Sequence, residues 1–325
     1  MKSTAIAPSN IAFIKYWGKK DEVLRLPENG SISMNLSNLL TTTTVEFNSS
    51  ARKDSVTING VQEPNDGNRA IKHLDRVRNL ANLSQKAKVV TINNFPSGTG
   101  LSSSSSGFAA LSLAGAKAAG LSLSEKELSI LARQGSGSAC RSIPDGFVEW
   151  LDGVTSETSY SRSLYPPDYW SIADVVAIVS VGKKDVSSAE GQKLVNSSPF
   201  FPVRRSHMPQ KINKMKEILK EKNFQTFGEL LEAEALELHA IMITSIPSLI
   251  YWTPGTLKIM KLVKKWRSEG LSVYFTINTG QDIHLICEKP NIKNIVTKLK
   301  EIEEVKNIII NYPSIGARLT QNHLF

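Results

Sequence analysis

Residues 95–107 read FPSGTGLSSSSSG, and this stretch decides how the rest of the chain is interpreted. The β-branched segment 88–92 precedes it, and an Ala-rich apolar segment follows it as far as Ala119. Apolar runs of these lengths on either side of glycines predict a strand, a glycine-rich loop and a helix. This order places the serines at the first turn of the helix.

The glycines and serines of this junction have a chemical consequence. Gly98 and Gly100 allow a close approach of the backbone to a ligand. Ser103 and Ser104 stand where free N–H groups and the helix dipole favour an anion, and their hydroxyls can bind phosphate or Mg²⁺. The loop therefore predicts phosphate binding, although it lacks the GxxxxGK[ST] pattern of a P-loop. A flexible serine loop that only caps a helix is the structural alternative.

Upstream of the loop, β-branched residues dominate and predict mainly strands. Asn59-Gly60 is typical of a tight turn that closes a strand. A segment with helical spacing of its apolar residues follows, and Asp66 is its predicted cap. The predicted elements are strands at 31–36, 41–47 and 55–58 and a helix at 66–83.

Downstream, Ser124 opens a short helix, and a turn of small residues, GSGSACR, follows at 135–141. A polar loop at 154–170 then leads into a buried strand at 173–181. The predicted later elements are helices at 186–196, 205–221, 224–244, 255–268 and 291–302 and strands at 272–277, 283–288 and 305–311. Mixed elements with antiparallel pairing predict an α+β fold in two halves, residues 1–172 and 173–325.

Composition limits the class of protein. The chain has 325 residues, 41% hydrophobic and 21% charged, which excludes disordered, collagen-like and coiled-coil proteins. A net charge of +9 suits nucleic acid, anionic lipid or phosphorylated metabolites. Two cysteines and five histidines form no metal motif and no disulfide framework. The sequence shows no export signal and no apolar run that could span a bilayer, so a cytoplasmic protein without a membrane partner is expected.

Three longer segments narrow the function. Residues 10–19 read NIAFIKYWGK, residues 135–141 continue to GFVEW at 146–150, and residues 184–191 read KDVSSAEG. Together with the phosphate loop, they resemble the signatures of diphosphomevalonate decarboxylases, which belong to the GHMP kinase superfamily. The resemblance implies the GHMP kinase fold, with a ribosomal-protein-like N-terminal half, an α/β C-terminal half and ligands in the cleft between them.

The resemblance also implies an activity. Enzymes of this family use ATP and Mg²⁺ to phosphorylate the tertiary 3-hydroxyl of mevalonate 5-diphosphate. Phosphate then leaves with CO₂, giving isopentenyl diphosphate in the mevalonate pathway of isoprenoid biosynthesis. Such a site must fix several negative charges, which calls for Arg, Lys, hydroxyls and helix N-termini.

Site residues follow from the same resemblance. Arg141 matches the arginine that holds the substrate carboxylate, Lys15 the lysine near the reacting hydroxyl, and Ser138 a further substrate contact. A salt bridge, a strand lysine and a turn serine are their respective structural alternatives. Cys140 is interpreted as packing. Substrate-binding matches are Tyr16, Lys19, Lys184, Ser187 and Ser188; cofactor-binding matches are Pro96, Gly98, Gly100, Leu101, Ser102, Ser103 and Ser104, with Ser103 also assigned to Mg²⁺.

The sequence departs from the family at one chemically important position. Relatives carry an aspartate in a pattern like Thr-Phe-Asp-Ala-Gly-Pro-Asn, whereas residues 276–282 read TINTGQD and place Asn278 there. An amide cannot accept a hydroxyl proton as a carboxylate can. Asp282 lies four residues later and cannot fill the same place without a shift of the loop. A smaller departure is Ser102, where relatives usually have alanine.

Asn278 leaves three interpretations open. It is an engineered change that traps a substrate complex, a natural variant that relies on positioning and charge neutralisation, or the mark of an ATP-independent bisphosphomevalonate decarboxylase. The retained phosphate loop and Lys15 speak against the third. In each case Asn278 belongs to the predicted catalytic set.

Other functions compete with the leading hypothesis. A decarboxylase of mevalonate 5-phosphate would share the fold and chemistry, and a mevalonate 3-kinase would not release CO₂. A catalytically silent regulator would explain Asn278. An RNA-binding module would explain the charge, but aromatics are only 7% and no RNA-binding motif is present, so no nucleic-acid partner is expected. The expected partner is a small phosphorylated mevalonate, and the resemblance implies a homodimer.

Overall fold

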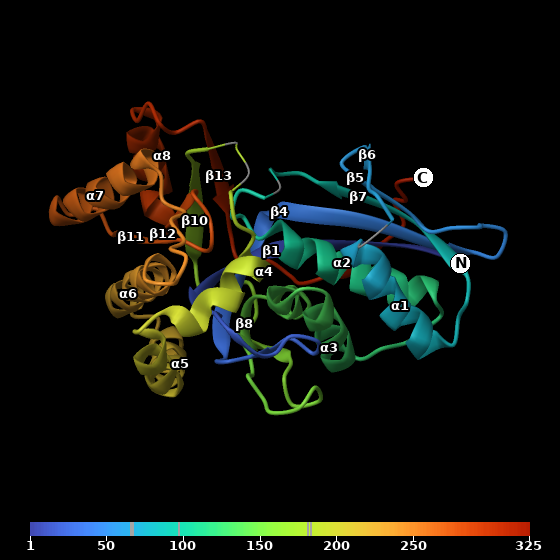
Figure 1. Cartoon of the computed structure of the whole chain (residues 1–325). Coiled ribbons are helices and arrows are strands. Elements are labelled where there is room, and N and C mark those ends of the chain that lie inside the picture. The colour runs from blue at the N-terminus through green and yellow to red at the C-terminus, as the bar shows by residue number, and fades with distance from the viewer. Residues whose placement is uncertain (66–67, 97, 181, 183) are drawn as a thin grey trace.

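The computed structural model describes residues 1–65, 68–96, 98–180, 182 and 184–325. Figure 1 shows two lobes: one is built on long strands covered by helices, and the other on a smaller sheet with its own helices. Among these residues, strand pairing is antiparallel except between β5 (Ser55–Ile58) and β7 (Lys86–Asn93). The predicted α+β class is therefore confirmed.

The larger sheet has eight strands, and its centre is one long antiparallel pair. Asn59 and Gly60 close the predicted tight turn between β5 and β6, with φ of 50° and 82°. The path of the sheet is β14 (Arg318–Thr320), β1 (Lys2–Ile14), β4 (Ser31–Asn48), β7, β5 and β6 (Val61–Gln62), while β8 (Phe147–Trp150) pairs with β4 and β9 (Ser161–Tyr165) with β8. A separate hairpin joins β2 (Lys19–Asp21) to β3 (Leu26–Pro27).

Three helices pack on the larger sheet: α1 (Arg69–Ala81), α2 (Ser103–Ala118) and α3 (Glu125–Gly135). Ser124 caps α3 in a reciprocal pair with Glu127, as its sequence pattern predicts. Leu74 and Leu111 belong to the same buried cluster as Val89 of β7. Burial of this apolar layer holds the start of α2 against the sheet.

The smaller sheet has the order β11 (Val273–Thr276), β12 (Ile283–Glu288), β10 (Ile172–Ile178) and β13 (Asn307–Asn311). Every residue of β10 is buried, as its mainly apolar sequence indicates, and this includes Asp174. Its helices are α6 (Phe224–Ile243), α7 (Pro254–Ser268) and α8 (Ile292–Lys300). The turn between β11 and β12 carries Asn278.

An aromatic cluster joins the two lobes. Phe13 of β1 meets Phe227 of α6 edge-on, with ring centroids 4.9 Å apart. Trp170 meets the same phenylalanine at 5.2 Å. Met208 and Met215 of α5 (Phe201–Glu221) complete the contact from the second half of the chain. This shared core fixes the end of β1 relative to α6 and so positions the site described below.

Several element boundaries differ from the sequence predictions. The strands predicted at 31–36 and 41–47 are one strand, β4. Helix α1 begins at Arg69 with Asn68 as its cap, and the predicted cap Asp66 lies outside the described residues. The polar loop 154–170 contains β9, and the predicted helix 186–196 is α4 (Ser188–Gly191) followed by a 3₁₀ helix (Gln192–Ser197).

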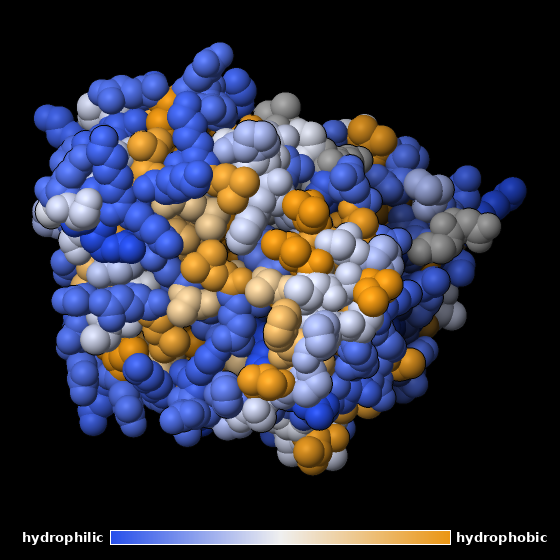
Figure 2. Space-filling model, turned by 60° about the vertical axis from the view of Figure 1, so that its left-hand side comes forward, coloured by the Kyte–Doolittle hydropathy of each residue, from blue (hydrophilic) through white to orange (hydrophobic). Residues whose placement is uncertain are grey.

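Figure 2 shows the face on the side of the C-terminal helices, where hydrophilic residues predominate and apolar residues gather toward the middle. Phe200, Val203, Ile246 and Ile250 are among the exposed large apolar residues of the chain. Of the helices that the structure describes, none is long and apolar enough to cross a membrane.

Candidate active site

The glycine loop and the start of α2 form one wall of a pocket, here called the loop wall (residues 98–104). Gly98 and Gly100 have φ of 81° and 112°, which glycine adopts without strain. A Cβ on Gly100 would lie 2.5 Å from the Cα of Gly280, so the loop touches the β11–β12 turn backbone to backbone. The Lys184 N–H donates to the carbonyl of Gly98 at 3.2 Å. Three distant segments therefore meet at this loop.

The first turn of α2 is open to a ligand. Ser102, which precedes it, adopts a left-handed conformation with φ 58°, and its side chain does not cap the helix. Its hydroxyl instead receives a hydrogen bond from the Asn278 amide at 3.1 Å. Ser103 is half-buried and Ser104 exposed at the same helix end. Free N–H groups and two hydroxyls here suit an anion, as the sequence predicts.

Opposite lies the inner wall, made of Lys15, Ser138 and Arg141. Lys15 follows the last residue of β1 and is 1% exposed. Its Nζ donates to the Ala12 carbonyl at 2.7 Å and to Asn278 Oδ1 at 3.2 Å. Burial lowers the pKa of Lys15 well below the usual value for lysine, because the ammonium loses its hydration.

Arg141 lies in a 3₁₀ helix (Gly137–Ser142) formed by the predicted turn of small residues. It is 4% exposed, and its Nη atoms donate to Ser31 Oγ at 2.7 Å and to Asn10 Oδ1 at 3.1 Å. Both partners are neutral, so its charge is not cancelled by a carboxylate at these contacts. Burial lowers the pKa of Arg141 from its usual value. Because no carboxylate accepts from its Nη atoms at these contacts, the guanidinium is available to an incoming anion.

Small residues of the same turn bring the inner wall close to α2. Ser138 Oγ makes a short hydrogen bond to Ser105 Oγ. The ring of Tyr16 packs against Gly137, where a Cβ would lie 2.9 Å from the Tyr16 hydroxyl. Tyr16 also meets Trp150 at 4.6 Å. A larger side chain at position 137 would displace Tyr16 from the pocket.

Segment 184–191 closes the pocket from the second lobe. Lys184 Nζ donates to Ser188 Oγ and to the Thr279 carbonyl, both at 2.7 Å, and to Thr279 Oγ1 at 3.3 Å. Burial lowers the pKa of Lys184 to about 8. Ser187 caps α4 in a reciprocal pair with Glu190 and also lines the pocket.

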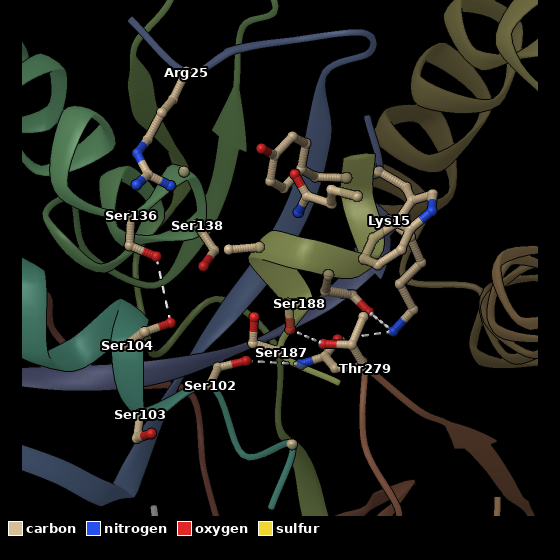
Figure 3. A pocket seen from close by; sticks show the side chains of 18 of the residues that line it. Lys15, Arg25, Ser102, Ser103, Ser104, Ser136, Ser138, Ser187, Ser188 and Thr279 are labelled. Carbon is tan, nitrogen blue, oxygen red and sulfur yellow. Dashed lines mark hydrogen bonds between the residues drawn. The ribbon is translucent and has the colours of Figure 1, made fainter. Parts of the chain in front are cut away.

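The pocket between these walls has a volume of about 230 Å³. Figure 3 shows Ser102, Ser103 and Ser104 along the start of α2, with Ser136 and Ser138 facing them. The Ser136 hydroxyl donates to Ser104 Oγ at 3.3 Å. The lining cations are Lys15, Lys19, Arg25, Arg69, Arg141 and Lys184. Within the described residues, no carboxylate lines this pocket, so its electrostatic character is strongly cationic.

Most predicted site residues line the pocket together, but two do not. Leu101 is buried in the core and Pro96 is exposed. Their predicted contact with a cofactor stays a prediction. Trp17 is 1% exposed and packs in the core, and Cys140 is buried, where burial raises its pKa to about 11. Cys140 is therefore an interior residue, in line with the packing role expected from the sequence.

Sequence reasoning missed two arginines at the pocket. Arg25 donates from Nε to the Gln134 carbonyl at 3.0 Å, and Arg69 donates to the Gly135 carbonyl at 3.0 Å. Burial, and then the charge of Arg25, lower the pKa of Arg69 to about 10. Two neighbouring cations without a carboxylate between them favour a multiply charged anion. Arg25 lies a few residues after segment 10–19, which was the nearest signal in the sequence.

A second pocket of about 480 Å³ adjoins the first and shares Arg69, Ser103 and Ser104 with it. Apolar residues form much of its lining, with Val56, Ile58, Phe108 and Leu111 among them. An apolar cavity next to a helix N-terminus suits a ligand with a flat ring and a phosphate tail.

Comparisons with known proteins agree with this geometry. Residues 7–161 match the family described as the diphosphomevalonate decarboxylase-like N-terminal domain, and residues 174–319 match the mevalonate 5-diphosphate decarboxylase C-terminal domain. The diphosphomevalonate decarboxylase of Candida albicans is 36% identical over 91% of this chain and 87% of that protein. The chain belongs to the diphosphomevalonate decarboxylase family.

Solved structures of diphosphomevalonate decarboxylases share the fold. The mevalonate diphosphate decarboxylase from Enterococcus faecalis superposes with a TM-score of 0.92 at 35% identity, covering 99% of both chains. The enzyme from Staphylococcus aureus gives 0.93 at 35% identity, covering 98% of both. The expected GHMP kinase fold is thus confirmed. A similar structure, described as MDDEF in complex with MVAPP, AMPPCP and magnesium, has a TM-score of 0.93 and 36% identity and covers 99% of both chains.

Proposed function

We propose that the chain catalyses the ATP-dependent decarboxylation of mevalonate 5-diphosphate to isopentenyl diphosphate, with ADP, phosphate and CO₂ as the other products. The observation that carries this proposal is the buried inner wall, where Lys15 and Arg141 face a pocket that is rich in cations. A plain kinase needs to hold phosphates, whereas a decarboxylase must also hold and then release a carboxylate. A buried arginine with neutral partners supplies that second function.

Different cations of the pocket bind different anionic groups of the substrate. Arg141 holds the carboxylate through its planar fork, and Ser138 lies beside it. Tyr16 and Lys19 lie toward the diphosphate, where Arg25 and Arg69 add the charge that a diphosphate requires. Lys184, Ser187 and Ser188 contact phosphate oxygens from the second lobe.

ATP occupies the loop wall and the adjoining apolar pocket. Its phosphates lie at the open first turn of α2, against Ser102, Ser103 and Ser104. Its adenine ring lies in the pocket lined by Val56 and Phe108. Gly98 and Gly100 allow the backbone to approach the phosphates because they carry no side chain.

The pocket offers Mg²⁺ hydroxyl oxygens as protein ligands. Within the described residues, no group of three or more His, Cys, Asp or Glu side chains could hold a metal ion. Mg²⁺ usually keeps several waters and binds through substrate phosphates, so a hydroxyl such as that of Ser103 is a sufficient protein ligand. When bound, the ion neutralises phosphate charge and orients the phosphoryl group for transfer.

Asn278 fits its surroundings as an amide. Its Oδ1 accepts from Lys15, and its Nδ2 donates to Ser102 and approaches the Asn10 carbonyl at 3.5 Å. A carboxylate oxygen would be repelled by that carbonyl. These contacts support the natural-variant interpretation, in which positioning does much of the work of phosphoryl transfer.

The assembly of the chain and its location in the cell are further proposals. We propose a homodimer, as the family resemblance implies, with light scattering as the test. We propose a cytoplasmic location, because Cys140 and Cys287 are both unpaired and buried, as in a reducing compartment. The halves 1–172 and 173–325 are proposed as domains, and limited proteolysis at 160–172 would reveal the boundary.

The activity is tested with purified protein, mevalonate 5-diphosphate, ATP and Mg²⁺, following ADP and CO₂ together. Equal amounts of both products support the proposal, while ADP without CO₂ would identify a kinase. Faster turnover of mevalonate 5-phosphate would assign that compound as the substrate instead. CO₂ from mevalonate 3,5-bisphosphate without ATP, and none from the other two substrates, would make the chain an ATP-independent decarboxylase.

A further inference from the structure

None of the described residues that line the pocket has a carboxylate that could accept the proton of the substrate's 3-hydroxyl. Asn278, which lies among them, is an amide. Burial raises the pKa of Tyr16 above its usual range, so its phenolate is disfavoured. His239 lies behind the pocket and hydrogen-bonds through Nε2 to the Asn278 carbonyl at 3.0 Å. The remaining titratable groups in the pocket are amines and guanidiniums.

The three pocket lysines differ in how their N–H groups are used. Lys184 Nζ has three hydrogen-bond acceptors, which match the three protons of an ammonium. Lys19 Nζ pairs with the carboxylate of Glu22 at 2.6 Å. Lys15 Nζ has two acceptors, both of them neutral carbonyl oxygens. Two acceptors match the two protons of a neutral amine, which leaves one lone pair for the pocket.

The orientation of the Asn278 amide is fixed by its other neighbours. Its Nδ2 lies 3.1 Å from Ser102 Oγ and 3.5 Å from the Asn10 carbonyl, which can only accept. Oδ1 must therefore point to Lys15, and Lys15 must be the donor. An aspartate here would form an ion pair that holds Lys15 as an ammonium, whereas the amide holds it without adding charge.

Charged groups around Lys15 come from several elements, and the nearest acid is already compensated. Glu234 of α6 accepts from the Lys15 backbone N–H at 3.1 Å, but it is paired with Arg204 at 3.1 Å and with Lys211 at 2.9 Å. Burial is the main cause that lowers the pKa of Lys15. The groups that face it are Glu234, His239, Arg204, Arg141 and Asp174.

We propose that Lys15 is the proton acceptor for the 3-hydroxyl in this chain and that Asn278 orients its amine. The inference rests on the proposed function and goes beyond it, because it assigns to a lysine the proton transfer that a carboxylate would otherwise perform. It explains why an amide at position 278 is compatible with a working site. Arg141 supplies a guanidinium for the substrate's anionic groups, so Lys15 is left to accept the proton.

The proton balance of the two steps is complete. In the first, the O–H bond breaks, its proton binds the Lys15 lone pair, and the oxygen attacks the γ-phosphorus as the bond to the ADP oxygen breaks. In the second, the C3–O bond breaks with its electron pair on phosphate, and the C1–C2 pair becomes the C2=C3 double bond as CO₂ leaves. Lys15 returns its proton to the departing phosphate, which restores the neutral amine.

The test compares Lys15→Arg in two backgrounds. Arginine keeps the charge but cannot accept a proton at accessible pH. In the unaltered background, Lys15→Arg is expected to lower kcat by about 10²–10⁴-fold. In the Asn278→Asp background the carboxylate accepts the proton, so the same change should cost about tenfold or less. Affinity for mevalonate 5-diphosphate, measured by calorimetry, should stay within about threefold. Lys258→Arg, at a surface ion pair with Glu304, is the matched control.

A second variant keeps the test decisive if arginine disturbs the fold. Lys15→Ala leaves space for a small added amine, and ethylamine is the probe. The restored rate should follow the concentration of the neutral amine and rise with pH, since only the neutral form accepts a proton. A rate that follows the ethylammonium ion would show that Lys15 supplies charge alone, and would overturn the proposal.

The outcomes separate this inference from the proposed function. An active Lys15→Arg in the unaltered background overturns the inference and leaves the function standing. A silent unaltered protein with an active Asn278→Asp variant also overturns it, because the base is then the missing carboxylate. If neither form releases ADP and CO₂ from mevalonate 5-diphosphate, the proposed function itself falls.

Discussion

The inner wall and the loop wall of the pocket solve the problem of binding anions in different ways. Lys15 and Arg141 of the inner wall are almost fully buried, and neutral partners accept hydrogen bonds from Lys15 Nζ and from the Arg141 Nη atoms. On the loop wall, Ser103 and Ser104 are more exposed, and the shape depends on a backbone contact between Gly100 and Gly280. The first wall is preorganised by side chains, the second by backbone geometry.

This difference predicts which property a substitution in each wall will change. Preorganised buried charges act strongly on a reacting group because little water screens them. A backbone-built wall gains little from any one side chain, so loss of one hydroxyl matters less than loss of the loop's shape. Changes to the inner wall should therefore act on catalysis, and changes to the loop wall on folding or on nucleotide affinity.

Arg141→Gln is the change with the largest expected effect. Glutamine can keep a hydrogen bond to Ser31 or Asn10 but supplies no charge to the substrate carboxylate. Loss of one preorganised charged donor should lower kcat/KM by about 10³-fold, equivalent to about 4 kcal/mol. Arg162→Gln, on the half-exposed ion pair with Glu149, is the control and should change kcat/KM less than about twofold. A loss below tenfold for Arg141→Gln would contradict the role of the inner wall.

Gly100→Ala tests the loop wall. The new Cβ would meet the Gly280 backbone at 2.5 Å at a φ of 112°, so the free energy of unfolding should fall by about 3 kcal/mol in urea denaturation. Gly60→Ala separates the two causes, because Gly60 also has a positive φ, of 82°, but a Cβ there meets nothing within 4 Å. It should cost about 1 kcal/mol. Equal losses would show that the Gly100–Gly280 contact is unimportant.

Much of the fold follows from local sequence signals. The Ser124 cap, the Asn59-Gly60 turn and the strand–loop–helix unit all form as predicted, because each depends on neighbours in sequence. The sequence predicts two strands where the structure has the single strand β4, because the strand pattern breaks at 37–40. At this point the pairing of β4 with β1 shifts register, between Pro8 and Asn10. Strand β14 could not be predicted, since its partner β1 lies at the other end of the chain.

The site was predictable where motifs mark it and not elsewhere. Lys15, Arg141 and Asn278 lie in recognisable segments, and the structure brings them to one pocket. Arg69 is simply the first residue of a surface helix in the sequence, and only packing of α1 beside α2 turns it toward the pocket. The hydrogen bond between Lys15 and Asn278, which are 263 residues apart, likewise depends on the tertiary fold and could not be predicted from a local pattern.

Lys184 closes the pocket from the second lobe and contacts the loop wall through Gly98, and it should make binding depend on pH. Burial lowers its pKa to about 8, so the ammonium predominates below pH 8 and is lost as the pH rises through that value. At pH 9 about a tenth remains protonated, and the affinity for mevalonate 5-diphosphate should fall by up to about tenfold relative to pH 7. Calorimetric titrations from pH 7 to 9 would measure this. Lys184→Arg should flatten the profile, and an unchanged slope would assign the dependence to another group.

Ser104→Ala and Ser138→Ala should have the smallest effects, and their contrast is the finest test of the two walls. Each removes one hydroxyl, which is worth about 0.5–1.5 kcal/mol, or about 2–10-fold in an apparent constant. Ser104 accepts from Ser136 at the open helix end, so its loss should raise KM for ATP and leave kcat unchanged. Ser138 lies on the inner wall against α2, so its loss should lower kcat instead. Steady-state kinetics with each substrate varied separately would distinguish these patterns, and a shared effect on KM for ATP would mean that the inner wall also positions the nucleotide.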